Sequence, residues 1–270
     1  MSKHGSARAG AAIVALAGCI LAGCGGVPKG TRPDVPGPGG NTVPTAGSSS
    51  VANATAQVSG QAPLTTHPAV PAKGFAQANS IPFPVAVGNT WVYQTSIDGQ
   101  GGRTTNKIVG AGPGSAGYRV TVSSTTNVGG SATTVVPVYT FYQDGTIGYP
   151  VPPVTGAPGT GGRIRWPDSA GLASGKVYHS VLRIQGERAD VTVQGAGTTS
   201  VRVPAGSYRA SVVKTTVTAQ GQTIEVTLWI AQGTGPVKTE VLIRAPGATG
   251  LTTNELLSFS KAVSVVGDGS

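Results

Sequence analysis

The chain has 270 residues, of which 11% are charged and 5% are aromatic, and its formal net charge at pH 7 is +9. Its two cysteines lie at positions 19 and 24, so the rest of the chain offers no thiol for a disulfide, for thiolate catalysis or for a cysteine-ligated metal. The excess of basic residues favours anionic partners such as lipid head groups or wall polymers.

Residues 1–23 have the three-part pattern of a secretory signal peptide. A short basic start is followed by an apolar, alanine-rich run over residues 9–22. That run is shorter than the about 20 apolar residues that a membrane-spanning helix needs. Cleavage of this leader predicts an exported protein, and an extracytoplasmic location excludes nucleic acid as a partner.

The leader ends in a motif that resembles a bacterial lipobox, in which the leader is removed and the cysteine is acylated, for example with palmitate. The motif is Leu-Ala-Gly-Cys at residues 21–24, and residues 16–19 carry the same four letters. Cleavage before Cys19 would leave an apolar region of only about 7 residues, the minimum for a signal peptide. Cys24 is therefore the predicted lipidation site, with Cys19 the alternative, and its acyl chains would anchor the protein on the outer face of the cell membrane.

Residues 24–80 are predicted to form a disordered spacer. Positions 25–80 contain nine glycines and eight prolines, together with many serine, threonine and alanine residues. Such a composition cannot bury enough apolar surface to offset the chain entropy lost on folding. As a flexible coil, the spacer would hold the following domain about 40 Å from the membrane on average.

Residues 81–270 are predicted to form one all-β head domain, because apolar residues alternate there with a period of two and no helical period is found. The first strand places Trp91, Tyr93, Thr95 and Ile97 on one face. A glycine-containing turn then returns the chain as a hairpin. Ten or eleven such strands predict a large antiparallel meander that curls into a barrel or half-barrel or splits into a sandwich.

Further strands are expected at residues 103–109, 118–122, 133–142, 147–151, 176–184, 188–194, 207–219, 223–231, 237–244 and 251–259, and residues 201–203 lead into a tight turn before the strand 207–219. Pro137 lies within one of them and predicts an edge or a bulge, because proline has no N–H to give to a sheet. The segment 152–162, rich in proline and glycine, is predicted to be a long, mobile loop.

Three short segments of the head carry a recognisable pattern. Residues 88–93 read GNTWVY, residues 203–208 read VPAGSY and residues 229–238 read WIAQGTGPVK. They resemble a GNxWxY … VPAGxF/Y … WxAxGxGxVK pattern in a broad group of uncharacterised bacterial exported proteins, with Tyr208 where phenylalanine is commoner. That group is distantly similar to half-barrel lipid carriers of the cell envelope, which implies an apolar groove and supplies no catalytic residues.

The residues of this pattern also have structural interpretations. Gly206 and Gly233 are expected to supply positive φ angles at turns, and Asn89 is expected to cap a turn. Trp91 and Trp229 are expected to fill the core between sheet layers.

The head shows no catalytic motif. Its one histidine, His179, lies in an alternating strand, although a triad with Asp168 or Asp190 and a serine would need only spatial proximity. No G-x-S-x-G, C-x-x-C, H-E-x-x-H or phosphate-loop pattern occurs. The acidic residues are scattered, and their positions do not predict a pair of carboxylates that face one cleft, as a glycosidase requires. We therefore expect a protein that is not an enzyme and that needs no metal and no cofactor.

Arg163 and Arg165 would share one face of an extended segment beside Trp166, where the long loop ends. The head has 14 basic and 9 acidic side chains, a formal charge of +5, and these three residues are its best candidates for contact with an anion or a lipid head group. The alternative is a solvated basic edge that prevents pairing between sheets of different molecules.

The sequence thus predicts a membrane-anchored exported lipoprotein whose head binds an apolar or amphiphilic ligand of the cell envelope. Lipid or an anionic wall polymer is the expected partner, and the sequence names no protein partner. A scaffold with a solid core that acts through its surface is the first alternative. A wall-active hydrolase is the remote alternative, and it would need His179 buried beside a carboxylate and a serine.

Overall fold

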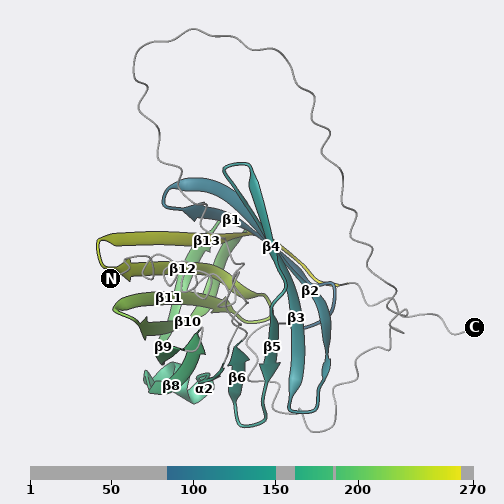
Figure 1. The fold of residues 1–270 in the computed structure, drawn as a ribbon. Helices are drawn as coiled ribbons and strands as arrows, with labels where there is room; N and C mark the ends of the chain where they lie inside the picture. The colour runs from purple at the N-terminus through teal and green to yellow at the C-terminus, as the bar shows by residue number, and fades with distance from the viewer. Residues whose placement is uncertain (1–83, 150–161, 185–186, 263–270) are drawn as a thin grey trace, which may run out of the picture. The chain divides into compact units, whose positions relative to one another are not determined.

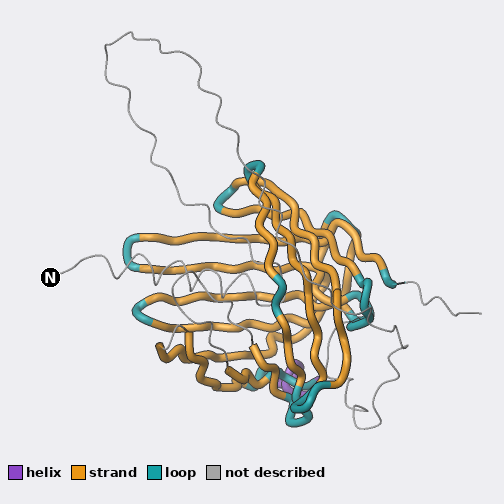
Figure 2. Tube along the Cα trace, turned by 45° about the vertical axis from the view of Figure 1, so that its right-hand side comes forward, coloured by secondary structure: helices purple, strands orange, loops and turns teal. Residues whose placement is uncertain are grey.

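The computed structural model describes residues 84–149, 162–184 and 187–262, and the strands of this part form one antiparallel sheet of thirteen. Strands dominate the described residues, with one short helix beside them (Figure 2). The predicted signal peptide, both cysteines and the predicted spacer lie outside the described residues. The strands are β1 (Thr90–Ile97), β2 (Gln100–Pro113), β3 (Tyr118–Val128), β4 (Ser131–Val135), β5 (Val138–Phe141), β6 (Thr146–Tyr149), β7 (Gly162–Arg165), β8 (Val177–Ile184), β9 (Glu187–Val203), β10 (Gly206–Ala219), β11 (Gln222–Ala231), β12 (Gly235–Ala245) and β13 (Ala248–Ser260).

Most strands pair with the strand next to them in sequence, as Figure 1 shows for β10 to β13. The spatial order is β7-β6-β5-β3-β2-β1-β13-β12-β11-β10-β9-β8, and β4 pairs with β3 off this path. The long-range pair is β1 with β13, which joins the first strand to the last in antiparallel register. This pair unites the two halves of the meander into a path of twelve strands.

The two ends of this path, β7 and β8, come back together. The backbone N–H of Arg165 on β7 donates a hydrogen bond of 3.2 Å to Ser180 Oγ on β8, and Gly162 lies against Leu182. No ladder of backbone hydrogen bonds joins these two strands in the described part, so the twelve-stranded barrel is nearly closed. The prediction of an all-β meander curled into a barrel is confirmed, and the barrel rather than the sandwich is the observed form.

Alternation along each strand separates an inner face from an outer face. On β1, Trp91, Tyr93, Thr95 and Ile97 are all buried, as the sequence predicts, whereas the residues between them are more exposed. Inward-facing apolar side chains of the other strands join Trp91 and Tyr93 in one core. The inner face therefore consists of the positions that the period of two selects.

Two strand predictions differ from the structure. The expected strand 133–142 is two strands, β4 and β5, because Pro137 interrupts the ladder, although its carbonyl oxygen accepts a 3.0 Å hydrogen bond from the Val122 N–H. The expected strand 188–194 and the segment 201–203 are parts of one strand, β9, of 17 residues. This long strand pairs with β10 across a bulge between Ser211 and Val213.

The sequence does not predict helix α2 (Ser169–Ser174), because six residues are too few to show a helical period. The Asp168 carboxylate caps its start by accepting a 2.7 Å hydrogen bond from the Gly171 N–H. Gly175, with a φ of 69°, ends the helix in the left-handed conformation. The helix packs on β9 at Gly195, where a Cβ atom would lie 2.6 Å from the Gly171 carbonyl oxygen.

Two of the segments that carry the sequence pattern are joined by side-chain hydrogen bonds. The Trp91 indole N–H donates to the Thr234 carbonyl oxygen at 2.6 Å. The Tyr93 hydroxyl donates to the Pro236 carbonyl oxygen at 3.0 Å, and both partners of this bond are buried. Together the two bonds fix the turn between β11 and β12 to β1.

Asn89 connects the first and last described segments. Its side-chain nitrogen donates to the Pro84 carbonyl oxygen at 3.1 Å, and its side-chain oxygen accepts from the Ala262 N–H at 2.8 Å. The predicted cap is therefore also a link between the two ends of the described part of the chain.

The remaining segment of the pattern docks on β13. The Ala205 N–H donates a 2.8 Å hydrogen bond to the Leu256 carbonyl oxygen. Gly206 and Gly233 have φ angles of 134° and 72°, so both expectations of a positive φ are confirmed.

Candidate functional site

Part of the inner face is polar. Thr95 lies on the same face of β1 as the core residue Tyr93, and the equivalent inner positions of four further strands also carry hydroxyl or amide side chains. All are at most 5% exposed. We call the following seven residues the inner polar tract: Thr95, Thr104, Asn106, Ser124, Thr126, Thr239 and Asn254. Since β3, β2, β1, β13 and β12 are consecutive neighbours in the sheet, the tract runs across five adjacent strands.

Four residues of the tract form a chain of hydrogen bonds. Thr126 Oγ1 and Thr104 Oγ1 lie 2.9 Å apart, and Thr95 Oγ1 lies 2.7 Å from both Thr104 Oγ1 and Asn254 Oδ1. A hydroxyl has one proton and an amide oxygen only accepts, so Thr95 donates to Asn254 and receives the Thr104 proton. The chain is thus satisfied within the protein.

Each of the other three residues of the tract has one side-chain oxygen atom without a partner. Asn106 Oδ1, Ser124 Oγ and Thr239 Oγ1 are buried and have no hydrogen-bond partner in the described protein, and Thr215 Oγ1 on β10 is a fourth such atom. Asn106 and Ser124 are opposite one another in the β2–β3 register. A buried polar atom without a partner costs about 1–3 kcal/mol, so a water molecule or a ligand that formed hydrogen bonds with these atoms would stabilise the barrel.

The strands on the other side of the barrel present an apolar wall. Its inner positions are almost all aliphatic, with Thr215 as the polar exception. The largest fully buried members are Val191, Val193, Val213, Val217, Ile224, Val226 and Leu228. The inner face as a whole is therefore amphiphilic, with hydroxyl and amide groups concentrated on one set of strands and hydrocarbon on another.

The predicted anion contact has a different arrangement from the one expected. Arg163 and Arg165 are exposed and share the outer face of β7, as predicted, but Trp166 is buried in the core. The alternation of the strand explains the difference, since Trp166 and Ile164 fall on the inner face. Trp166 is therefore withdrawn from the surface that the two arginines share.

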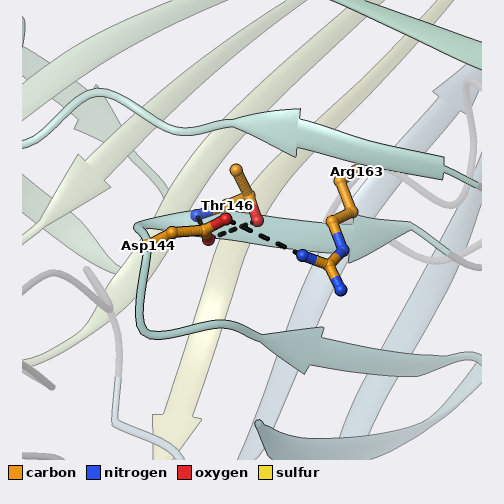
Figure 3. Close-up of polar contacts among 3 residues, drawn as sticks. All are labelled: Asp144, Thr146 and Arg163. Carbon is orange, nitrogen blue, oxygen red and sulfur yellow. Dashed lines mark hydrogen bonds and ion pairs between the residues drawn. The ribbon is translucent and has the colours of Figure 1, made fainter. Parts of the chain in front are cut away.

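Arg163 already has partners in the protein (Figure 3). Its guanidinium lies 3.7 Å from the Asp144 carboxylate and 3.7 Å from the centre of the Tyr142 ring. Thr146 holds Asp144 in place with two hydrogen bonds, from its hydroxyl at 2.6 Å and from its N–H at 2.9 Å. These hydrogen bonds, and more weakly the charges of the two arginines, lower the pKa of Asp144.

The side chains considered for a hydrolytic triad are exposed or already engaged in other contacts. His179 is exposed on the outer face of β8, so it lacks the burial that the hydrolase alternative requires. The Asp168 carboxylate caps α2, and Asp190 pairs with Arg188 at 2.8 Å. Among the described residues, no three His, Cys, Asp or Glu side chains are placed to hold a metal ion.

The expectation that Trp229 fills the core is wrong. Trp229 alternates with the buried residues Leu228 and Ile230 on β11 and is half-buried on the outer face. The Lys238 ammonium lies 5.3 Å from its ring centre and also pairs with Glu240 at 3.0 Å and Glu255 at 3.2 Å. This outer cluster is a self-satisfied ion-pair network.

No helix in the described ranges is long and apolar enough to cross a membrane.

No protein-family description and no curated protein matches the chain. Two solved structures resemble it weakly. One is provisionally described as a lipoprotein of Parabacteroides distasonis ATCC 8503, with 17% identity and a TM-score of 0.43, covering 66% of this chain and 98% of that one. The other is an exported protein with a YmcC-like fold from Bacteroides fragilis NCTC 9343, with 17% identity, a TM-score of 0.41 and the same coverage.

Proposed function

We propose that this chain is an exported lipoprotein, anchored to the membrane through Cys24, whose barrel binds an amphiphilic ligand of the cell envelope in its interior without catalysing a reaction. The signal peptide and the lipobox-like motif support the anchoring. The amphiphilic inner face of the barrel supports the binding.

The unpartnered polar atoms of the inner face are the observation that carries this proposal. Left without partners, the four atoms would together cost a free energy comparable with the whole stability of an ordinary domain, about 5–15 kcal/mol. A barrel that needed only a solid core would favour valine in place of Thr215 or Thr239, since valine fills the same space without a hydroxyl group. An amphiphilic ligand would supply hydrogen bonds to the tract and hydrocarbon to the facing wall.

The number of strands supports the same proposal. An eight-stranded barrel is just wide enough for its own side chains to fill the interior, whereas wider barrels enclose ligand cavities or channels. The path here has twelve strands, and many of its buried side chains are as small as valine, threonine or alanine. Side chains of this size would not be expected to fill the interior of a barrel of twelve strands, which leaves room for a ligand.

Native mass spectrometry tests the proposal. The full chain carrying Cys19→Ser and Cys24→Ser would be exported by a bacterium, so that no covalent acyl chain adds mass, and purified without detergent. We expect an additional mass that fragments as a lipid or another amphiphile. A clean protein mass that stays unchanged after incubation with an envelope lipid extract would contradict the binding role.

The scaffold alternative also has an observation in its favour. Val177 and Val181 are 43% and 48% exposed on the outer face of β8. A protein partner that bound this strand would bury both valines. Crosslinking in the envelope, with Val181→Lys as the variant that blocks the contact, separates this role from ligand binding, because the variant leaves the inner face intact.

A further inference from the structure

We infer that the polar part of the ligand is uncharged and carries hydroxyl groups, as in a glycosylated or free acylglycerol, and that Asn106 and Ser124 hold it. This inference rests on the proposed function and specifies the ligand class.

The first argument, that the polar part of the ligand is uncharged, comes from the lack of charge in the interior. The buried polar side chains of the described residues are threonine, serine, asparagine and glutamine, and none of them is charged. A phosphate or carboxylate placed among them would lose its hydration without meeting a counter-charge, which is far more costly than burying a neutral polar group. An anionic head group is therefore a poor match for this interior.

The basic residues lie elsewhere. Arg163 and Arg165 are exposed on the outer face of β7, and Lys238 forms its ion pairs on the outer face of β12. These cations can attract an anionic surface from outside. Their position on the outer face keeps them from neutralising a charge among the tract residues.

The second argument, that the ligand carries hydroxyl groups, comes from the donors and acceptors that the unpartnered atoms need. Asn106 Oδ1 is an acceptor and needs an O–H or N–H from the ligand, while Ser124 Oγ both donates and accepts. Ester and phosphodiester oxygens only accept, so they cannot satisfy Asn106 Oδ1. A hydroxyl group donates and accepts, so it suits both residues.

The β2–β3 register places the two residues together. Asn106 is directly opposite Ser124, and on its other side it is opposite Trp91 of β1. The hydrogen-bonded chain begins one inner position away on each strand, at Thr104 and Thr126. The pair therefore lies where the satisfied part of the tract ends and an external group can continue it.

A comparison of two lipids with the same acyl chains tests the charge. Binding of monoglucosyl diacylglycerol and of phosphatidylglycerol to the full chain, with both cysteines replaced by serine, would be measured by native mass spectrometry titration. We expect the neutral glucosyl lipid to bind at least tenfold more tightly. Equal or tighter binding of phosphatidylglycerol would overturn the inference while leaving the proposed function intact, and binding of neither lipid, nor of any lipid in an envelope extract, would overturn both.

A matched pair of variants tests the placement. Ser124→Ala removes an unpartnered inner hydroxyl, whereas Ser123→Ala removes the neighbouring hydroxyl on the other face of β3. We expect Ser124→Ala and Asn106→Leu each to weaken binding of the glucosyl lipid about tenfold, as the loss of one hydrogen bond to a buried group implies, and Ser123→Ala to leave it unchanged. Melting temperatures control for folding. Unchanged binding by both inner variants would overturn the assignment to this pair.

Discussion

The indole N–H of Trp91 donates a hydrogen bond of 2.6 Å to the carbonyl oxygen of Thr234, which lies 143 residues further along the chain. Tyr93 makes the matching bond to Pro236, two residues further on in both segments. β13 lies between β1 and β12, so the strand ladder does not pair β1 directly with the segment that carries Thr234 and Pro236. The two side chains provide a tertiary contact that the sheet itself lacks.

Replacing Trp91 by phenylalanine should destabilise the barrel. The change removes the N–H that satisfies the Thr234 carbonyl oxygen and leaves a gap in the core, where Trp91 also stacks on Phe259 with ring centres 5.0 Å apart. We expect a loss of about 1–3 kcal/mol in the free energy of unfolding, measured by urea denaturation. Trp229→Phe is the matched control, and its half-buried position on the outer face predicts a smaller loss. Equal losses would contradict this role of the Trp91 bond.

The Tyr93 phenol should make the barrel less stable at alkaline pH. Burial raises the pKa of Tyr93 above its ordinary value near 10. The unfolded chain therefore loses this proton first, so the stabilisation is fully present below about pH 10 and falls as the pH rises above it, by up to about 1.4 kcal/mol per pH unit. We expect Tyr93→Phe to lower stability at neutral pH and to reduce the alkaline slope. Tyr118, whose partial burial raises its pKa in the same direction, accounts for part of the slope that remains.

Replacement by valine should change the free energy of unfolding in opposite directions at two threonines of the inner face, one without a hydrogen-bond partner and one with two partners. Thr239 has a hydroxyl with no partner in the described protein, so Thr239→Val should raise the free energy of unfolding of the ligand-free protein by about 1 kcal/mol. Thr95 joins Thr104 to Asn254, so Thr95→Val should lower it, because both neighbours lose a partner. Denaturant titration of the delipidated protein measures both changes. A loss of stability in Thr239→Val would mean that the protein alone satisfies this hydroxyl.

The course of the sheet follows from the sequence to a large extent. The period of two along Trp91, Tyr93, Thr95 and Ile97 identifies the inner face because one side of each strand must be buried. Local alternation does not show that β1 pairs with β13, since that pairing depends on the curvature of the whole sheet. This is why the sequence leaves barrel and sandwich as alternatives.

The polar tract could not be recognised from the sequence. Threonine is common in strands on both faces because its branched side chain suits the pleated surface, so Thr104 and Thr126 give no sign of facing inward. Only the register places them beside Thr95 and Asn254 on adjacent strands. The error on Trp229 has the same origin, because aromatic residues favour either face of a strand.

The packing of α2 on the sheet should depend on the lack of a side chain at Gly195. A Cβ atom there would lie 2.6 Å from the Gly171 carbonyl oxygen, so Gly195→Ala must displace the helix from β9. We expect a loss of about 1–3 kcal/mol, the range for overpacking, in thermal or urea unfolding. Gly101→Ala is the control, because no atom lies within 4 Å of the added Cβ atom and its φ is not positive. If both variants were equally stable, the close approach of α2 to β9 would be wrong.

The hydroxyl of Thr146, more than the charge of Arg163, should set the acidity of Asp144. The hydrogen bond from the Thr146 side chain is the largest contribution to the lowered pKa of Asp144, and the Arg163 guanidinium acts across 3.7 Å at an exposed position. Thr146→Val should therefore raise the pKa of Asp144 more than Arg163→Gln does, as carbon-13 NMR titration of the carboxyl group would measure. Because the folded-state pKa is the lower one, this carboxylate stabilises the fold above its ordinary pKa near 4, and the contribution is lost as the pH falls. Because the pair is exposed, that contribution to stability is small. If the pKa of Asp144 rose more in Arg163→Gln than in Thr146→Val, the ion pair rather than the hydrogen bond would be the main cause of the lowered pKa.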